Sequence, residues 1–194
     1  MKIFNLYSTA EVKVEDPGLK DYINTDEKLV LRNVGRAREK FAKVKVNVVE
    51  RLANLLAVPG HRGKKHKIIT HSSGKYTKNM KIVLACLKII EEKTKQNPIQ
   101  ILVKAIENSA PRDEITVIEY GGARYPQAVD MSPSRRVSIS LRNIVHGAYD
   151  KSFNKKTKIR ETLANEIMLA AENKTDAFAV QKRNESEKQA DSAR

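Results

Sequence analysis

The sequence has no tryptophan and a single cysteine, Cys86, which lies in the apolar run IVLACLKII. Because one cysteine cannot form an internal disulfide, a cytosolic compartment is the simpler interpretation. We expect the thiol to be a buried small apolar group rather than a nucleophile. No apolar run approaches the length of a membrane-spanning helix, and the first residues turn acidic and polar too soon for a signal peptide. These absences predict a soluble intracellular protein with no membrane partner.

The sequence also lacks the short motifs of nucleotide-binding and catalytic sites, namely GxxxxGK[ST], GxGxxG, HExxH and GxSxG. Three of the four histidines, His61, His66 and His71, lie in one segment. They have no cysteine partners, and the lysines beside them would repel a cation. Asp113 and Glu114 are neighbours on an expected strand, so their carboxylates point to opposite faces. We therefore expect no enzyme activity, no metal, no cofactor and no small-molecule substrate.

Acidic residues are in deficit: 37 Lys and Arg oppose 23 Asp and Glu, which gives a net charge of +14. This imbalance exceeds what solubility needs and favours a polyanionic partner, with nucleic acid ahead of an acidic membrane. Aromatic residues make up only 5%. Few aromatics argue against stacking on single strands and favour recognition of the backbone and shape of folded, double-helical RNA or DNA.

Helical periodicity predicts a mainly α fold, a bundle of about six helices with one protruding β-hairpin and an extended basic N-terminal arm. Asn97, Ser132 and Thr157 are the expected N-caps of three of these helices. Gly121-Gly122 is the expected turn of the hairpin, at about 114–130. We expect Glu50 and Arg51, within the first helix, to be surface charges. The domain boundaries that we predict are an extension at 1–45, basic in its second half, a helical nucleic-acid-binding domain at 46–175 and a C-terminal helix or tail at 176–194.

Basic residues gather in three segments, at 32–45, 62–81 and 135–160. Arg135 and Arg136 are unexpected there, because they follow a predicted helix start whose positive dipole end disfavours arginine. The same end suits a phosphate, so we predict that this pair binds phosphate and matters little to the stability of the fold; the alternative is that both side chains simply reach solvent. The residues that we expect to bind the nucleic acid are Arg32, Arg36, Arg38, Lys40, Lys43, Lys45, Arg62, Lys64, Lys65, Lys67, Lys75, Lys78, Arg135, Arg136, Arg142, Lys155, Lys156 and Lys158.

Several long motifs resemble the universal small-subunit ribosomal protein seven family. They are VVERLANLL followed by GKK, NPIQILVKAIENSAPRDEIT, YGGARYPQAVDMSPSRRVSISLRNIV, LANEIMLAA and the final SAR. The resemblance covers about 46–194, more loosely from EVKVEDPGLKDYIN onward. The insertion KHKIITHSSGKYTKN and the form YGGARYPQAVD are more similar to archaeal than to bacterial members.

The resemblance implies a structural, rRNA-binding protein of the cytoplasmic small ribosomal subunit, acting in translation within a ribonucleoprotein. Such proteins bind the 3′ major domain of small-subunit rRNA, nucleate assembly of the head, and neighbour other head and platform proteins. The basic residues given above would contact rRNA, with Lys64-Lys65 and Arg135-Arg136 matching family motifs. The hairpin tip, near exit-site tRNA and mRNA, would be formed by Gly121, Gly122, Arg124 and Tyr125.

Some positions depart from the family pattern. Asn47 stands where relatives usually carry proline or an apolar residue, and Ser186 and Gln189 replace apolar positions of the last helix. These replacements lead us to expect a C-terminal helix that docks weakly on the domain. A DNA-binding or chromatin-like architectural protein is the alternative function, and an RNA-processing enzyme is a third that lacks a catalytic constellation.

Overall fold

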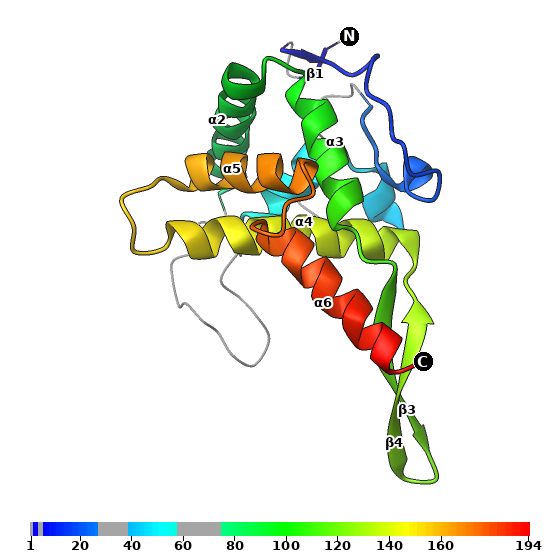
Figure 1. Cartoon of the computed structure of the whole chain (residues 1–194). Coiled ribbons are helices and arrows are strands. Elements are labelled where there is room, and N and C mark those ends of the chain that lie inside the picture. The colour runs from blue at the N-terminus through cyan, green and yellow to red at the C-terminus, as the bar shows by residue number, and fades with distance from the viewer. Residues whose placement is uncertain (1, 4–5, 27–38, 58–74) are drawn as a thin grey trace.

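The computed structural model describes residues 2–3, 6–26, 39–57 and 75–194. Within these ranges it contains six α-helices, two short 3₁₀ helices and two antiparallel strand pairs (Figure 1). The mainly α fold with one long hairpin confirms the prediction from the sequence. In chain order the elements are β1 (Lys2–Ile3), β2 (Tyr7–Ser8), η1 (Lys20–Tyr22), η2 (Ala42–Lys45), α1 (Val48–Leu55), α2 (Tyr76–Thr94), α3 (Pro98–Ser109), β3 (Asp113–Tyr120), β4 (Ala123–Asp130), α4 (Pro133–Ser152), α5 (Ile159–Ala171) and α6 (Phe178–Ser192).

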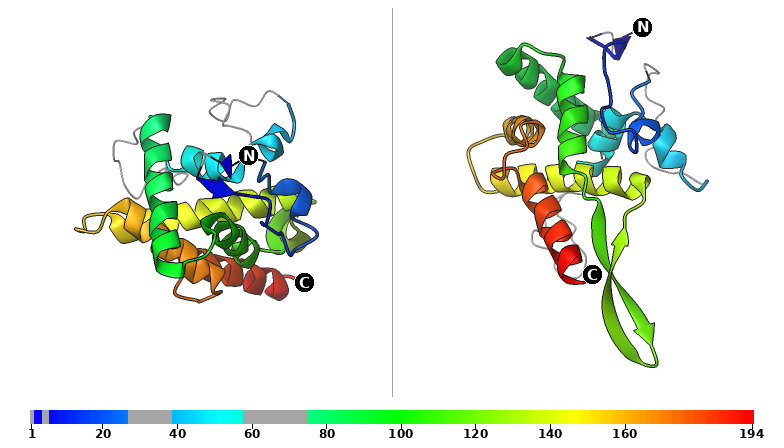
Figure 2. Two further views of the ribbon diagram at one scale, coloured as in Figure 1. Left: turned by 90° about the horizontal axis from the view of Figure 1, so that it is seen from above. Right: turned by 45° about the vertical axis from the view of Figure 1, so that its right-hand side comes forward.

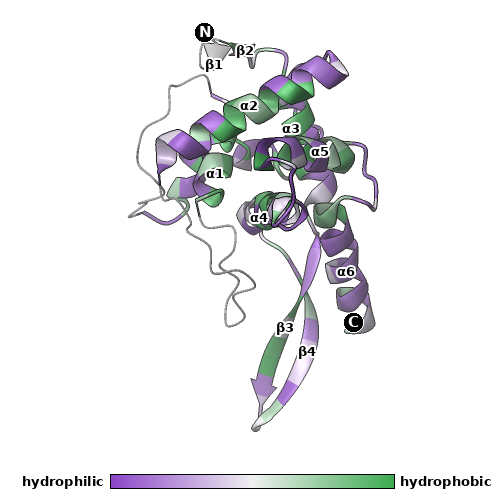
Figure 3. Ribbon diagram, turned by 90° about the vertical axis from the view of Figure 1, so that its left-hand side faces the viewer, coloured by the Kyte–Doolittle hydropathy of each residue, from purple (hydrophilic) through white to green (hydrophobic). Residues whose placement is uncertain are grey.

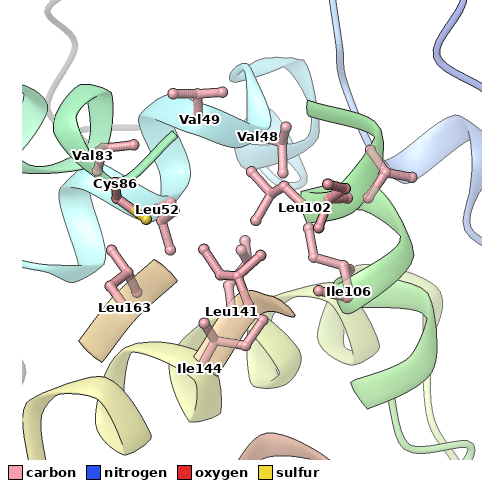
Figure 4. Close-up of a cluster of buried hydrophobic side chains, with 14 of the residues drawn as sticks. Val48, Val49, Leu52, Val83, Cys86, Leu102, Ile106, Leu141, Ile144 and Leu163 are labelled. Atoms are coloured by element: carbon pink, nitrogen blue, oxygen red, sulfur yellow. The ribbon is translucent and has the colours of Figure 1, made fainter. Parts of the chain in front are cut away.

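The hydrophobic core lies where α1 to α5 meet (Figure 4). Each of these helices turns an aliphatic stripe inward at helical spacing, as amphipathic helices do. Cys86 is fully buried among them, and burial raises the pKa of its thiol far above the usual range, so the expected role as a small apolar residue is confirmed. Residues of the core include Val48, Val49, Leu52, Val83, Cys86, Leu102, Ile106, Leu141, Ile144 and Leu163.

Two asparagines fix the starts of α1 and α3. Asn97 accepts a hydrogen bond from the backbone N–H of Ile99 (3.0 Å), which confirms the predicted N-cap. Its amide nitrogen also donates to the carbonyl of Ser8, so the same side chain holds β2 against α3. Asn47 caps α1 in the same way by accepting from the N–H of Val49 (2.9 Å). The polar residue at position 47 therefore has a structural role as a cap.

Of the other two predicted caps, Ser132 is confirmed in position and Thr157 is wrong. Ser132 occupies the N-cap position of α4, but its side chain makes no capping hydrogen bond. Its carbonyl oxygen accepts from the N–H groups of Arg135 and Arg136 as the helix begins. Helix α5 begins at Ile159 with Lys158 as its N-cap, so Thr157 lies one position too early to cap it.

The hairpin of β3 and β4 projects away from the helical body (Figure 1). Its strands pair in register from Asp113 with Asp130 to Tyr120 with Ala123, which places the turn at Gly121-Gly122 as predicted. Both glycines have positive φ, 57° and 81°, a conformation that two-residue hairpin turns require and that other residues rarely adopt. The tight turn therefore depends on this glycine pair.

Residues 13–16 of the N-terminal extension lie along α3 (Figure 2). The side chain of Gln100 accepts from the N–H of Lys13, and that of Glu107 accepts from the N–H groups of Glu15 and Asp16. Leu19 and, at 4% exposure, Ile23 add apolar anchors to the core. Most of the basic half of the extension, residues 27–38, lies outside the described residues, and the division at residue 45 stays a prediction.

Helix α6 docks on the domain through the buried residues Ala179 and Val180 at its start and through polar contacts further along, so the expectation of weak docking is wrong. Arg183 donates to the carbonyl of Asn108 at the end of α3, and Ser186 donates to the carbonyl of Asp113 (3.1 Å) at the base of β3. Arg194 pairs with the carboxylate of Asp113 at 2.6 Å. Helix α6 is largely hydrophilic (Figure 3). An argument from apolar periodicity therefore could not predict its docking. Ser186 thus holds α6 to the hairpin base by a specific hydrogen bond.

A buried carboxylate joins three helices at the start of α6. Glu166 of α5 is fully buried; its carboxylate accepts from the ammonium of Lys151 on α4 (2.6 Å) and from the N–H of Ala179 on α6 (3.2 Å). The second contact satisfies a backbone donor that no side-chain cap serves. Gly147 leaves the space for this arrangement, since a Cβ there would lie 2.6 Å from the Cβ of Phe178.

Candidate RNA-binding surface

Exposed cations extend along α4 and into the loop that follows it. Arg135 and Arg142 are exposed seven residues apart, so they lie on one face of the helix, about 10 Å apart along its axis. Lys155, Lys156 and Lys158 are exposed in the loop between α4 and α5, at the end of α4 away from the hairpin (Figure 1). Because α4 has 20 residues, the row spans about 30 Å. A row of this length can contact several phosphates of one nucleic acid.

Five more of the predicted cations are exposed outside this row. Lys40, Lys43 and Lys45 are exposed in or beside η2, and Lys75 and Lys78 are exposed at the start of α2. The carboxylate of Glu39 is 3.9 Å from Lys45, but both side chains are largely in water, so this pair contributes little to stability. The other four form no ion pair among the described residues, and their charges are available to a polyanion.

A pocket of about 260 Å³ lies between η2 and the row on α4, because Lys43 of η2 and Arg142 of α4 both line it. Arg51 of α1 lines the same pocket and is only 8% exposed, so the predicted surface position of this residue is wrong. Its guanidinium donates to the carbonyl of Tyr22 and to the hydroxyl of Ser138, both at 3.1 Å. Arg51 is the site residue that sequence reasoning missed, since a single arginine between apolar helix positions carries no signal of burial.

Glu50 is also buried, at 3% exposure, and burial raises the pKa of its carboxyl, while a hydrogen bond with Asn54 acts in the opposite direction. The predicted surface position is therefore wrong for both charges of α1. The physical reason is that α1 is enclosed: it packs against α2 and α4, and residues 48–53 are all buried.

Arg135 and Arg136 have carboxylate partners within the fold. Arg135 donates from Nε and Nη2 to one oxygen of Glu114 at the hairpin base (3.0 and 2.7 Å), and its side chain stays 55% exposed. Arg136 pairs with Asp16 at 3.0 Å and donates to the carbonyl of Pro111 at 3.1 Å. Only 13% of its side chain is exposed. The expectation that neither arginine matters to the fold is therefore wrong for Arg136, while phosphate binding by the pair stays a prediction.

The hairpin tip has little net charge. Arg124 lies 3.5 Å from the carboxylate of Glu119 on the opposite strand, which balances the two charges. Tyr120 is 82% exposed, and Tyr125 is exposed opposite Ile118. The tip therefore offers aromatic rings and backbone groups to a partner, in contrast to the cations along α4.

Other predicted site residues lie outside the described residues. They are Arg32, Arg36, Arg38, Arg62, Lys64, Lys65 and Lys67, together with His61, His66 and His71. In the part that is described, no three His, Cys, Asp or Glu side chains gather as a metal site would require. None of the helices in the described ranges is long and apolar enough to cross a membrane.

Comparisons with known proteins agree with the resemblance that the motifs indicated. The family model of ribosomal protein S7p/S5e matches residues 20–194. "Small ribosomal subunit protein uS7" of Nanoarchaeum equitans is 48% identical over 196 residues, which cover 100% of this chain and 99% of the relative. The protein of the same description from Methanothermobacter thermautotrophicus is 49% identical, and the match covers 98% of this chain and 98% of the relative. The one from Methanococcus maripaludis is 42% identical, and the match covers 100% of this chain and 99% of the relative. These relatives are archaeal ribosomal proteins and not enzymes, and we conclude that this chain belongs to the ribosomal protein S7p/S5e family.

Proposed function

We propose that this protein is a structural component of the small ribosomal subunit in the cytoplasm and binds the 3′ major domain of its rRNA. The names of the relatives support the place in the small subunit. The observation that carries the RNA-binding surface is the row of exposed cations on α4 and in the α4–α5 loop, with Lys155, Lys156 and Lys158 free of carboxylate partners among the described residues. No catalytic group is needed for this function.

Binding would be electrostatic, with geometry supplied by the helical core. Each lysine or arginine that neutralises a phosphate releases a condensed counterion, which makes the affinity depend on salt concentration. Because α4 packs on α1, α5 and α6, its cations keep fixed positions relative to one another. A rigid spacing of charges selects a folded RNA whose phosphates have a matching spacing.

The hairpin would have a different role from the cationic row. It projects from the body, and its tip, Gly121, Gly122, Arg124 and Tyr125, is nearly neutral and exposes aromatic side chains. A projecting tip with little net charge is better suited to brief contacts with exit-site tRNA and mRNA, which bind and leave, than to permanent binding of rRNA phosphates. The body would nucleate assembly of the subunit head and contact neighbouring head and platform proteins.

The test is a charge-removal experiment with a matched control. We expect Lys155, Lys156 and Lys158, all changed to Gln, to weaken binding to a 3′ major domain rRNA fragment. The slope of log K against log salt should flatten by about 2 to 3, close to 0.9 for each phosphate that is no longer neutralised. The control changes three exposed lysines on other elements, Lys88, Lys104 and Lys188, to Gln.

Equally weakened binding in the two triple variants would contradict the assignment of the surface. Binding of duplex DNA in preference to the rRNA fragment would favour the alternative, a DNA-binding architectural protein. Failure of the protein to sediment with the small subunit in a sucrose gradient would contradict the proposed function as a whole.

A further inference from the structure

The pocket between η2, α1 and α4 contains a buried cation without a counter-charge among the described residues. Arg51 is 8% exposed, and its two hydrogen-bonded acceptors, the carbonyl of Tyr22 and the hydroxyl of Ser138, are neutral. No carboxylate lies within ion-pair distance of it in the part of the chain that the structure describes. Burial also lowers the pKa of its guanidinium. A buried unpaired charge costs several kcal/mol, so this arginine needs a reason to be there.

The surroundings of Arg51 point to an anion. Two more cations, Lys43 and Arg142, line the same pocket, and none of its described lining residues is acidic. A guanidinium carries five N–H donors, and the two acceptors above leave donors for a ligand. Three cations converging on one hollow suit a phosphate, which accepts charge-assisted hydrogen bonds from several donors at once.

The rest of the lining fits a nucleoside attached to that phosphate. Val46, Leu55 and Leu141 supply apolar surface, and Asn54 and Ser138 supply polar groups. A hollow of about 260 Å³ is near the lower end of small-molecule sites and too small for a duplex groove. Proteins read folded RNA at bases that are turned out of the helix and placed on such surfaces.

We propose that this pocket holds one unpaired nucleotide of the bound RNA, with its phosphate between Arg51, Lys43 and Arg142 and its base against the apolar wall. This inference rests on the proposed function, since it assigns one fixed point within the RNA-binding surface. It differs from the row on α4 in kind: the row contacts phosphates at the surface, while the pocket, which shares Arg142 with the row, takes a single nucleotide below it. The guanidinium of Arg51 is then buried with its counter-charge.

The test replaces Arg51 and Arg142 separately. Arg51→Met removes the charge and keeps most of the volume. The loss of the hydrogen bonds to Tyr22 and Ser138 opposes the gain from removing an unpaired buried charge. We expect this variant to weaken binding to the 3′ major domain rRNA fragment about tenfold or more, because a hydrogen bond between charged groups is removed. The slope of log K against log salt should fall by about 0.9. Because the lost hydrogen bonds and the removed charge have opposing effects on stability, the melting temperature should change little.

Arg142→Gln is a second variant for the same binding experiment, and we do not expect this change to affect the stability of the fold. Arg142 is exposed and makes no ion pair within the described ranges, so we expect weaker binding at an unchanged melting temperature. Lys104→Gln, an exposed charge on α3, is the control and should bind like the unchanged protein. Removing single bases from the RNA should then reveal one position whose removal weakens binding to the unchanged protein but has no effect on Arg51→Met.

Three results would overturn the inference: Arg142→Gln binding like Lys104→Gln, no RNA position whose effect depends on Arg51, or a melting temperature of Arg51→Met that falls in proportion to the binding. The last result would mean that Arg51 acts only through Tyr22 and Ser138. In each case the unchanged protein still binds the fragment. Failure of the unchanged protein to bind would instead contradict the proposed function.

Discussion

The neighbouring residues Arg135 and Arg136 should separate cleanly into one that matters to RNA binding and one that stabilises the fold. Changing Arg136 to Ala removes the ion pair with Asp16 and the hydrogen bond to Pro111. A hydrogen bond to a charged group is worth about 1.5–3 kcal/mol, and an exposed ion pair about 0–1 kcal/mol. With 13% of the Arg136 side chain and 30% of Asp16 exposed, we expect Arg136→Ala to lower the free energy of unfolding by about 2–3 kcal/mol.

Arg135→Ala should cost less than about 1 kcal/mol, because its pair with Glu114 is more than half exposed on the arginine side. In a protein of this size about 1 kcal/mol moves the melting temperature by 2–4 °C, so the expected shifts are about 5–10 °C for Arg136→Ala and no more than about 3 °C for Arg135→Ala. Arg135→Ala should in turn flatten the salt dependence of rRNA binding by about 0.9.

Thermal unfolding followed by circular dichroism measures both shifts. Asp16→Asn, alone and combined with Arg136→Ala, isolates the ion pair, and the double variant should be less destabilised than the sum of the two single variants. Equal melting temperatures for Arg135→Ala and Arg136→Ala would refute the reasoning. So would additive effects of the changes at 16 and 136.

Three further changes test the buried charges and the docking of α6. Glu50→Gln should raise the melting temperature at pH 7, because burial raises the pKa of the Glu50 carboxyl. Above about pH 4.3 the folded state therefore binds more protons than the unfolded state, and the stability of the protein with Glu50 falls as the pH rises. Gly147→Ala should cost about 1–3 kcal/mol by overpacking against Phe178 and Glu166, which outweighs about 1 kcal/mol of helix propensity. Glu166→Leu should cost about 2–3 kcal/mol in urea unfolding, less than a fully buried pair because Lys151 can reach solvent.

Each of these changes has its own control or contradiction. The gain from Glu50→Gln must vanish near pH 4, and a gain that is the same at every pH would show that charge is not its cause. Asn143→Ala, elsewhere on α4, should be tolerated where Gly147→Ala is not. If Glu166→Leu leaves the urea midpoint unchanged, the three-helix junction does not stabilise α6.

Local chemistry was enough to predict several elements from the sequence. Asn97 followed by Pro98 marks the start of α3, and the paired glycines mark the hairpin turn, because each signal acts within a few residues. That the lysines and arginines outside the apolar stripes would mostly be exposed could likewise be predicted. Each of these arguments needs only neighbours in the sequence.

The remainder depended on partners far apart in the chain. Asp16, the partner of Arg136, precedes it by 120 residues, and nothing in either local sequence indicates the pair. Arg51 becomes a pocket residue only because α4 brings Ser138 against α1. The polar docking of α6 escaped prediction because apolar periodicity measures only one of the ways in which a helix can be held.

The contacts of α6 with Asp113 have a mechanical consequence for the hairpin. Each strand has eight residues, which at about 3.3 Å each makes the hairpin roughly 25 Å long. A lever of that length turns a tilt of about ten degrees at its base into a displacement of about 4 Å at Gly121, which is more than the length of a hydrogen bond. The carbonyl and carboxylate of Asp113, held by Ser186 and Arg194, lie close to the pivot. The contacts of Ser186 on α6 and of Arg194 just beyond it therefore help to set the direction in which a distant turn points.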